Sequence, residues 1–366
     1  MKLPFFIYRY CTQYSKKDAI FETFSNYKSI TIFLNSKLNN NQSMNKLAVI
    51  ALGGNALLRD NQAGTIEEQE ENTTETIENL IFLLKEGYNL VLTHGNGPQV
   101  GNIVMRNDAG EQMYKIPQMP LDICVADSQG GIGYMIERCM RNVLKKHGIQ
   151  KNVLTLMTLV EVSANDQAFD NPTKRIGKIV NDQEAEKLSN EKGWIFKEEK
   201  KETTGLRRVV PSPQPVKIMN WDIIEQNARN GSVVIAVGGG GVPVYFDNEG
   251  NVRPAEAVID KDLASALLAT EIKADEFYIL TDVPYVYVDY KKETQQILEF
   301  LDYKDAMKYT EIGMFGEGSM APKMKAALYF IKNGGKQSVI TEAKKLEDKK
   351  FGTKITMEYD PEDLKK

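Results

Sequence analysis

Histidine and cysteine are scarce in this sequence of 366 residues, which has two of the former and three of the latter. None of Cys11, Cys124 and Cys139 forms a CxxC pair with another. A disulfide framework is therefore excluded, and a zinc site built on histidine and cysteine is disfavoured. We expect a reducing, cytoplasmic compartment and no resident metal ion.

Long apolar runs and an excess of positive charge are also missing. No run approaches the roughly 18–20 apolar residues that a membrane-spanning helix needs. Lys and Arg total 46 against 50 Asp and Glu, which gives a net charge of −4 and disfavours binding of nucleic acid through bulk charge. Hydrophobic residues make up 42% of the chain, enough for a sizeable core. We therefore predict a soluble globular protein whose partners are neither a membrane nor a nucleic acid.

Residues 1–43 differ in composition from the rest of the chain. They hold six Lys or Arg against two Asp or Glu, and they are crowded with Phe and Tyr. A basic segment with little acid is typical of an organelle-targeting peptide, but this one has a single arginine, Arg9. The alternative, which we favour, is a dispensable extension that precedes a domain starting at Met44.

After Met44, short apolar runs alternate with amphipathic segments. Each run is too short for a helix and is bounded by glycine or polar residues. The runs predicted to be buried strands are Leu47–Leu52, Asn89–Thr93, Val153–Val160, Ser232–Val237, Phe277–Thr281 and Ser338–Thr341. Helices are predicted between the first two strands, at Leu121–Lys146 and at Met324–Lys332. This alternation indicates an α/β fold with a mostly parallel sheet and helices on both faces.

The region from about 165 to 214 breaks this alternation. It contains Asn-Pro-Thr-Lys at 171–174, a charged run at Lys197–Glu202 and Pro-Ser-Pro at 211–213. We predict an insertion or a small subdomain with polar surfaces. Long insertions in compact domains are often lids or binding loops. The insertion therefore either has a functional role of this kind or is a surface segment without a function.

Glycine clusters follow several of the predicted strands. They are Gly53-Gly54-Asn55, Gly95-Asn96-Gly97, Gly238–Gly241 and, later, Gly316-Glu317-Gly318-Ser319-Met320. Ligands of parallel sheets bind beyond the carboxyl ends of the strands, and glycine lets backbone N–H groups approach an anion closely. The clusters therefore predict a phosphate-rich ligand. The P-loop motif GxxxxGK[ST] is absent. A loose match to the dinucleotide fingerprint occurs at 316–321, but it follows the helical segment Tyr303–Ile312 rather than a strand, so we do not interpret it as a dinucleotide site.

Lysine supplies the positive charge near these loops. Lys261 lies between two aspartates and enters an amphipathic helix, while Lys323 lies between a glycine loop and the start of another helix. Lys174 belongs to the insertion, and His94, at a strand end, could donate a hydrogen bond to a ligand. No nucleophile and base are marked by local context. Catalysis by positioning and charge is therefore favoured over nucleophilic catalysis.

These motifs resemble those of the carbamate kinases, within the amino-acid kinase family. The stretches that carry the resemblance are 51–56 (ALGGNA), 93–101 (THGNGPQVG), 171–174 (NPTK), 257–262 (AVIDKD) and 318–323 (GSMAPK). The likeness extends from about Met44 to Thr356. It implies a three-layer αβα sandwich and a homodimer. It also implies a carbamate lobe at 44–230, which includes a protruding subdomain at about 165–214, a nucleotide lobe at 231–358 and a tail at 359–366.

The resemblance also implies a role for each matching residue. Catalysis would depend on Lys174, Lys261, Asp262 and Lys323, with Asp262 orienting the lysines. The transferred phosphoryl group and carbamate would be bound by Gly53, Gly54, Asn55, Gly95, Asn96 and Gly97. The nucleotide would be bound by Gly239, Gly240, Gly241, Thr281, Asp282, Gly318, Ser319 and Met320. ATP or ADP would be a substrate, and Mg²⁺ would be carried by the nucleotide.

The implied reaction is reversible phosphoryl transfer between ATP and carbamate, with ATP formation from ADP and carbamoyl phosphate favoured. The carbamoyl groups would come from arginine breakdown or from purines, and the sequence leaves both sources open. Carbamate is already an anion, so its attack needs no general base, and cations and positioning suffice. The subdomain departs from the family pattern at Arg175, where proline is usual, and at 204–208. The alternative is a kinase of the same family that acts on another carboxylate, such as an amino acid or acyl-amino acid. An oxidoreductase and a silent nucleotide sensor are disfavoured.

Overall fold

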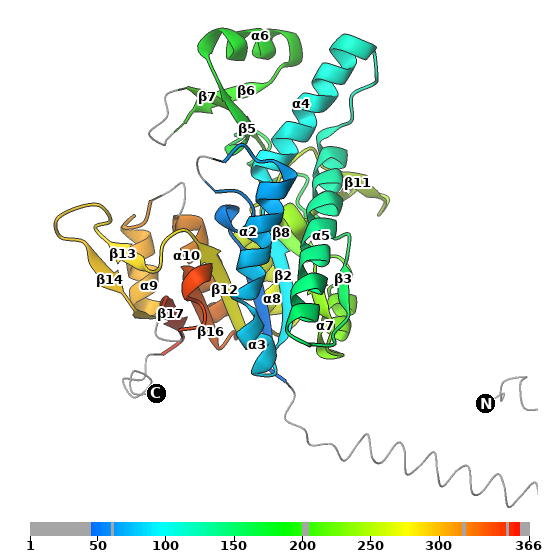
Figure 1. Ribbon diagram of the computed structural model, residues 1–366. Helices are drawn as coiled ribbons and strands as arrows, with labels where there is room; N and C mark the ends of the chain where they lie inside the picture. Colours follow the sequence, from blue (N-terminus) through cyan, green and yellow to red (C-terminus); the bar gives the residue numbers. More distant parts are fainter. Residues whose placement is uncertain (1–44, 60–61, 200–204, 317–319, 349–350, 359–366) are drawn as a thin grey trace, which may run out of the picture. The chain divides into compact units, whose positions relative to one another are not determined.

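A mostly parallel sheet runs through the part of the chain that the computed structural model describes, residues 45–59, 62–199, 205–316, 320–348 and 351–358 (Figure 1). Within these ranges its eight strands are, in spatial order, β15 (Phe300–Asp302), β17 (Thr353–Thr356), β16 (Gln337–Glu342), β12 (Glu276–Thr281), β1 (Leu47–Leu52), β2 (Asn89–His94), β9 (Val233–Ile235) and β3 (Val153–Thr155). The β16–β17 pair is antiparallel and the other neighbouring pairs are parallel. The predicted mostly parallel α/β fold is confirmed.

Helices cover both faces of this sheet because alternate side chains of a strand point to opposite sides. The whole of β1 is buried. Its second, fourth and sixth residues belong to a core with α2 (Ile66–Glu78), α3 (Ile81–Lys85) and α5 (Leu121–Lys146). Its first, third and fifth residues belong to a second core with α7 (Trp221–Arg229), α8 (Lys261–Glu271) and α10 (Met320–Lys332). This two-sided burial explains why the strand is an uninterrupted apolar run.

The prediction of one strand at Val153–Val160 is wrong, because the chain changes sheet there. After β3 it continues as β4 (Leu159–Val162), in a second sheet of order β11 (Val252–Pro254), β10 (Val242–Phe246), β4 and β8 (Pro215–Ile218). Between the strands, the Thr158 N–H donates to Oε1 of Gln129 at 2.6 Å, and the Thr158 hydroxyl accepts from the Val237 N–H at 3.0 Å. These bonds occupy the N–H and the hydroxyl of Thr158 at the point where the chain leaves one sheet for the other, which the apolar pattern alone does not reveal.

Two helix boundaries also differ from the predictions. The helix expected between β1 and β2 is broken into α2 and α3 at Asn79, whose side-chain amide donates to the Glu75 carbonyl at 2.8 Å. The helix predicted from Met324 starts at Met320. By contrast, α5 has the bounds predicted for it.

The insertion forms its own small antiparallel sheet, of order β5 (Lys174–Val180), β7 (Leu206–Val210) and β6 (Ile195–Glu198), with α6 (Asp182–Lys192) between β5 and β6 (Figure 1). It meets α4 (Gly97–Tyr114), where a Cβ on Gly101 would lie 2.0 Å from the Gly177 Cα. Gly177 also has a φ of +71°, at the irregularity in the β5–β7 pairing. The two glycines therefore allow the subdomain backbone to touch α4 directly.

The remaining described elements are β13 (Val286–Val288), β14 (Gln296–Leu298), α9 (Tyr303–Glu311) and three short 3₁₀ turns, η1 (Gly54–Ala56), η2 (Gly238–Gly240) and η3 (Ala343–Lys345). The predicted extension at 1–43 and the tail at 359–366 lie outside the described residues. None of the described helices has the length and apolarity to cross a membrane.

Glu271, at the end of α8, makes the stability of the fold depend on pH. This half-buried carboxylate accepts a hydrogen bond from the Ile218 N–H at 3.1 Å, and burial raises its pKa from 4.5 to about 7. The folded state therefore holds this proton more tightly than the unfolded chain, so the stability that it contributes is lost as pH rises through 7. We expect Glu271→Gln, which keeps an acceptor but cannot ionise, to melt above the parent at about pH 8 and close to it at about pH 5. An equal difference at both pH values, measured by calorimetry, would contradict this assignment.

Candidate functional site

A cavity of about 700 Å³ lies beyond the carboxyl ends of β1 and β12. Its lining includes the following predicted site residues: Gly53, Gly54, Lys174, Lys261, Asp262, Thr281, Asp282 and Lys323. These come from the loops after two strands, from the subdomain and from the starts of α8 and α10. The fold thus brings residues that are far apart in the sequence to one edge of the sheet.

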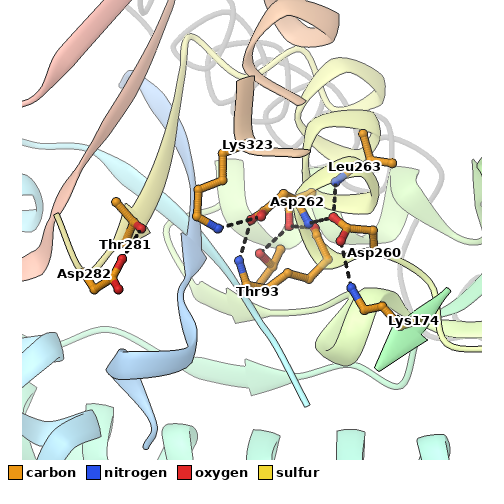
Figure 2. A network of polar contacts seen from close by, with 10 residues as sticks. Thr93, Lys174, Asp260, Asp262, Leu263, Thr281, Asp282 and Lys323 are labelled. Carbon is orange, nitrogen blue, oxygen red and sulfur yellow. Dashed lines mark hydrogen bonds and ion pairs between the residues drawn. The ribbon is translucent and has the colours of Figure 1, made fainter. Parts of the chain in front are cut away.

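Asp262 joins two of the lysines (Figure 2). One of its oxygens accepts from Lys323 Nζ at 2.9 Å and the other pairs with Lys261 Nζ. The carboxylate is 5% exposed and the two lysine side chains are 13% and 14% exposed. Burial opposes ionisation of Asp262, but the two ammonium groups outweigh it and hold its pKa well below its usual range. One carboxylate between two cations leaves this group of three side chains with a net positive charge.

The pKa values of the two lysines are shifted in opposite directions. Burial lowers the pKa of Lys261, and the neighbouring Lys323 charge adds to this effect. Burial also acts on Lys323, but the charge and hydrogen bond of Asp262, with smaller contributions from Asp260 and Asp282, raise its pKa overall. An incoming anion would therefore stabilise Lys261 most, because its charge is the less compensated of the two.

Asp260 connects the subdomain to the start of α8 (Figure 2). Its Oδ1 caps the helix by accepting from the Asp262 N–H at 2.9 Å and the Leu263 N–H at 3.3 Å, and its Oδ2 accepts from Lys174 Nζ at 2.7 Å. Lys174 is the first residue of β5. Our sequence analysis did not assign Asp260 to the site, although an aspartate directly before a helix is a typical N-cap.

Two glycines pack closely around the cluster. A Cβ on Gly53 would lie 2.3 Å from the Leu280 carbonyl oxygen, because the ends of β1 and β12 converge there. A Cβ on Gly95 would lie 3.2 Å from Lys261 Cδ. The loop after β2 therefore packs against the stem of Lys261 and helps to fix that side chain.

The rest of that loop does not line the cavity. Gly95, Asn96 and Gly97 lie outside its lining, and the Asn96 amide donates to Ser128 Oγ at 2.8 Å in the interior. His94 is also turned inward, since its Nδ1 hydrogen-bonds to the Gly95 carbonyl at 2.9 Å. Burial lowers the pKa of His94 to about 4, so at neutral pH it is an uncharged support of the loop.

The glycine cluster after β9 is buried behind the site rather than facing the cavity. Gly239, Gly240 and Gly241 have φ values of +68°, +90° and +88°, a region that favours glycine. A Cβ on Gly239 would lie 2.2 Å from Asn96 Nδ2, and one on Gly240 would lie 2.6 Å from the Ile259 carbonyl oxygen. Backbone conformation and packing account for these glycines in the structure.

Two of the remaining predicted residues belong to described elements. Asn55 is in η1, and Met320 is the first residue of α10, partly buried against the core. Gly318 and Ser319 lie outside the described residues. Arg175, which departs from the family pattern, donates from Nη2 to the Glu198 carbonyl at 2.8 Å, so it ties β5 to β6.

A charged group at the cavity wall was missed by the sequence analysis. Glu75, on α2, pairs with Arg59 and, at 3.1 Å, with Lys344 Nζ, and all three side chains line the cavity. They come from three separate segments without a recognisable motif. The cavity therefore carries cations that are additional to the three predicted lysines.

Two lining carboxylates could take part in holding a metal ion that arrives with a nucleotide. Asp282 and Glu342 form no ion pair with another described residue, and the described contact of Asp282 is a hydrogen bond from Thr281 Oγ1 at 3.0 Å. Mg²⁺ prefers one or two carboxylates together with phosphate oxygens, so this donor set fits it. Within the described residues, no group of three or more His, Cys, Asp or Glu side chains is placed to hold a metal by itself.

A nucleotide-sized cavity with clustered lysines at the edge of a parallel sheet defines a phosphotransferase. Residues 46–342 match the sequence profile of the Amino acid kinase family, and the chain belongs to this family. Within it, the chain belongs to the carbamate kinases.

Relatives of known identity cover nearly all of the described chain. The carbamate kinase of Pyrococcus horikoshii is 45% identical over 316 residues, which are 86% of this chain and 100% of that protein. The carbamate kinase of Giardia lamblia bound to AMP-PNP is 39% identical with a TM-score of 0.78, covering 86% of this chain and 99% of that one. The citric acid complex of the Giardia lamblia enzyme is 38% identical with a TM-score of 0.80, and it covers 86% of this chain and 99% of that one.

Proposed function

We propose that this protein transfers a phosphoryl group reversibly between ATP and carbamate, and that ATP formation from ADP and carbamoyl phosphate is the favoured direction. The observation that carries the proposal is the cluster of three lysines and two aspartates at the wall of one large cavity. Carbamate kinase relatives, one of them bound to the ATP analogue AMP-PNP, support it. Carbamoyl phosphate is a mixed anhydride, so its phosphoryl group transfers downhill to ADP.

The chemistry needs charge and alignment rather than a base. In the favoured direction, a terminal phosphate oxygen of ADP attacks the phosphorus of carbamoyl phosphate, the bond from phosphorus to the carbamoyl oxygen breaks, and carbamate leaves as an anion. Both reactants are anions, so cations must bring them together and cover the charge on the transferring group. Lys261 and Lys323 would do this from fixed positions, because Asp262 and the Gly95 loop hold them.

Mg²⁺ carried by the nucleotide would supply further positive charge between the phosphates. Asp282 and Glu342 are the lining residues that would hold it. Thr281 and Asp282 would also border the nucleotide.

Lys174 would exchange partners when substrate arrives. Its ammonium is bound to Asp260 at 2.7 Å, and a carbamoyl phosphate oxygen would compete for it. Asp260 would then retain its contacts with the start of α8. We infer that Asp260 is a positioning residue, which keeps the subdomain lysine at the cavity before substrate binds.

We expect Lys174→Ala to raise the KM for carbamoyl phosphate by about tenfold or more and to slow turnover, while the KM for ADP stays nearly unchanged. Lys178→Ala is the matched control, because Lys178 lies on the same strand but pairs with Glu184 at 3.1 Å, away from the cavity. Steady-state kinetics on both variants decide between the outcomes. A Lys174→Ala enzyme that weakens only ADP would show that the subdomain does not serve the acceptor side.

The assignment of each substrate to one lobe of the chain is also a proposal. We assign carbamoyl phosphate to the lobe at 44–230, with its subdomain at about 165–214, and the nucleotide to the lobe at 231–358. The first contributes Gly53, Gly54 and Lys174 to the cavity, and the second contributes Thr281 and Asp282. Residues 1–43 would be dispensable for catalysis, because the residues that form the site follow them.

We propose that the protein is a homodimer joined through α5 and the end of α4. Large apolar side chains are exposed there: Met113, Tyr114, Ile116, Met119, Ile123 and Tyr134. Ile123 and Tyr134 lie three turns apart on one stripe of α5, at 41% and 66% exposure. Apolar exposure of this extent is typical of a protein interface.

We expect light scattering at micromolar concentration to give the mass of a dimer for the parent protein and the mass of a monomer for Tyr134→Glu. A monomeric parent would refute the proposal.

Coupled ATP formation from ADP and carbamoyl phosphate by the purified protein tests the function itself. The reverse assay compares carbamate with amino acids and acyl-amino acids as phosphoryl acceptors. Transfer to one of those carboxylates in preference to carbamate would establish the alternative, a kinase of the same family with a different substrate. Activity with none of them would refute both.

A further inference from the structure

Two adjoining cavities lie between α4 and the subdomain, apart from the catalytic cavity. One is about 200 Å³ and the other about 260 Å³, and both are lined by Val104, Trp194 and Arg208. Neither shares a lining residue with the cavity that contains the lysine cluster. Together they fall within the roughly 300–1,000 Å³ typical of small-molecule sites, and we refer to them as the α4 chamber.

Arg208 is at the centre of one wall of the α4 chamber. It lies on β7, directly opposite Ile176 of β5 and Phe196 of β6. Directly opposed residues of an antiparallel sheet point to the same face, so the guanidinium is flanked by two apolar side chains. On its other side, the guanidinium stacks over the Trp194 ring with its Cζ 3.8 Å from the ring centroid.

Arg208 is also the basic residue of the chamber that forms no ion pair with another described residue. In the first cavity, Asp108 pairs with Lys192 at 3.1 Å, and Lys178 pairs with Glu184 at 3.1 Å. Arg208 forms no hydrogen bond or ion pair with another described residue, and Asp108 of the first cavity and the exposed Glu256 of the second act on it only as more distant negative charges. Burial lowers the pKa of Arg208 to about 10, which reflects the cost of holding this charge among apolar groups.

We propose that the α4 chamber binds a small organic anion, a carboxylate on a flat apolar body, with Arg208 as its anchor. The guanidinium fork matches a carboxylate in two parallel hydrogen bonds. Trp194, Phe196 and Val104 offer apolar surface beside it for a ring or a branched chain. Polar anions without such a body, such as phosphate, would leave those walls unfilled.

The place of the chamber predicts an effect on catalysis. The subdomain backbone touches α4 at Gly101 and Gly177, and the first cavity is lined by both of these residues. Farther back along the same strand is Lys174, which pairs with Asp260 at the catalytic cavity. A ligand bound between α4 and β5 would fix the angle between α4 and the subdomain, and with it the position of Lys174. It should therefore change the KM for carbamoyl phosphate. The predicted effect on the KM rests on the proposed function, whereas binding of the anion in the chamber does not.

Trp194 provides a direct binding assay. The chain has two tryptophans, so Trp221→Phe leaves Trp194 as the sole tryptophan, in stacking contact with Arg208. We expect phenylacetate to change its fluorescence saturably, with neutral phenylacetamide having no such effect. Arg208→Gln should weaken phenylacetate binding by at least about tenfold, whereas Arg106→Gln, an exposed residue of α4, should leave it unchanged. A response that does not saturate, or that persists in Arg208→Gln, would overturn the proposal.

Two further variants separate binding in the chamber from misfolding and from binding at the lysine cluster. Val104→Phe keeps Arg208 but fills the chamber, so it should also abolish the response; a full response in this variant would refute the assignment of the site. Lys261→Met should retain the response, and its loss there would place the anion in the catalytic cavity instead. In the active enzyme, phenylacetate should change the KM for carbamoyl phosphate at a constant KM for ADP. Binding without any kinetic effect would overturn the coupling, and competition with ADP would overturn the separate site.

Discussion

Replacing Lys261 by methionine is expected to lower kcat by about 10²–10³, the usual cost of removing one preorganised donor at a transferring group. Methionine keeps most of the stem against which the Gly95 loop packs, so the loop should stay in place. Lys261 is the less compensated of the two cations on Asp262. Its charge is therefore available to the phosphoryl group as negative charge spreads in the transition state.

Nucleotide affinity separates this role from a general loss of structure. ADP binding by calorimetry should persist in Lys261→Met, and Lys323→Met should behave in the same way. Lys325→Met is the matched control, because Lys325 is exposed on the same helix two residues beyond Lys323. If Lys261→Met kept its kcat and lost ADP affinity instead, the lysine would serve ground-state binding of the nucleotide and not the transfer step.

The elements that could be predicted from sequence are those in which one local pattern dominates. The strand Leu47–Leu52 is buried on both faces, so every residue is apolar, and its bounds match the prediction. The helix Leu121–Lys146 has one continuous buried stripe and ends before Gly148. Where a hydrogen bond from a distant element decides the outcome, as at Thr158 with Gln129, the local pattern is insufficient.

The predicted site residues also differ in how reliably the sequence indicates their role. Lys261 and Lys323 stood out because each lies where a motif meets a helix start, and the fold brings both to Asp262. The glycines after β9 produced an equally strong signal, yet in the structure they are buried behind the site. A glycine needed for a left-handed backbone and one needed for a ligand look identical in a sequence.

Contacts between distant segments account for what the sequence did not reveal. Glu75 and Lys344 are separated by most of the chain and meet at the cavity. Asp260 acts through Lys174, which arrives from the subdomain. Neither contact is encoded in a spacing within one element, so only the folded chain displays it.

Asp262→Asn is expected to destabilise the fold by about 3–5 kcal/mol at neutral pH, since it leaves buried cations without their counter-ion. Asn is close to isosteric, so packing changes little, and the loss reports on charge. Adding Lys323→Met removes one of the two cations and should restore a substantial part of the stability, giving a large coupling energy in a double-mutant cycle. Urea denaturation of the four proteins measures it.

The pH dependence of that variant gives the sharper test. Without Asp262, the pKa of Lys261, which burial already lowers, should fall further. A depressed lysine pKa penalises the folded state while the amine is charged. The penalty begins to shrink as pH rises through the folded pKa and is gone above the unfolded pKa of about 10.4. The deficit of Asp262→Asn should therefore shrink between about pH 7 and about pH 10. A deficit that stays constant over this range would mean that Asp262 stabilises the protein through hydrogen-bond geometry, and that the net positive charge of the Lys261–Asp262–Lys323 group has no energetic consequence.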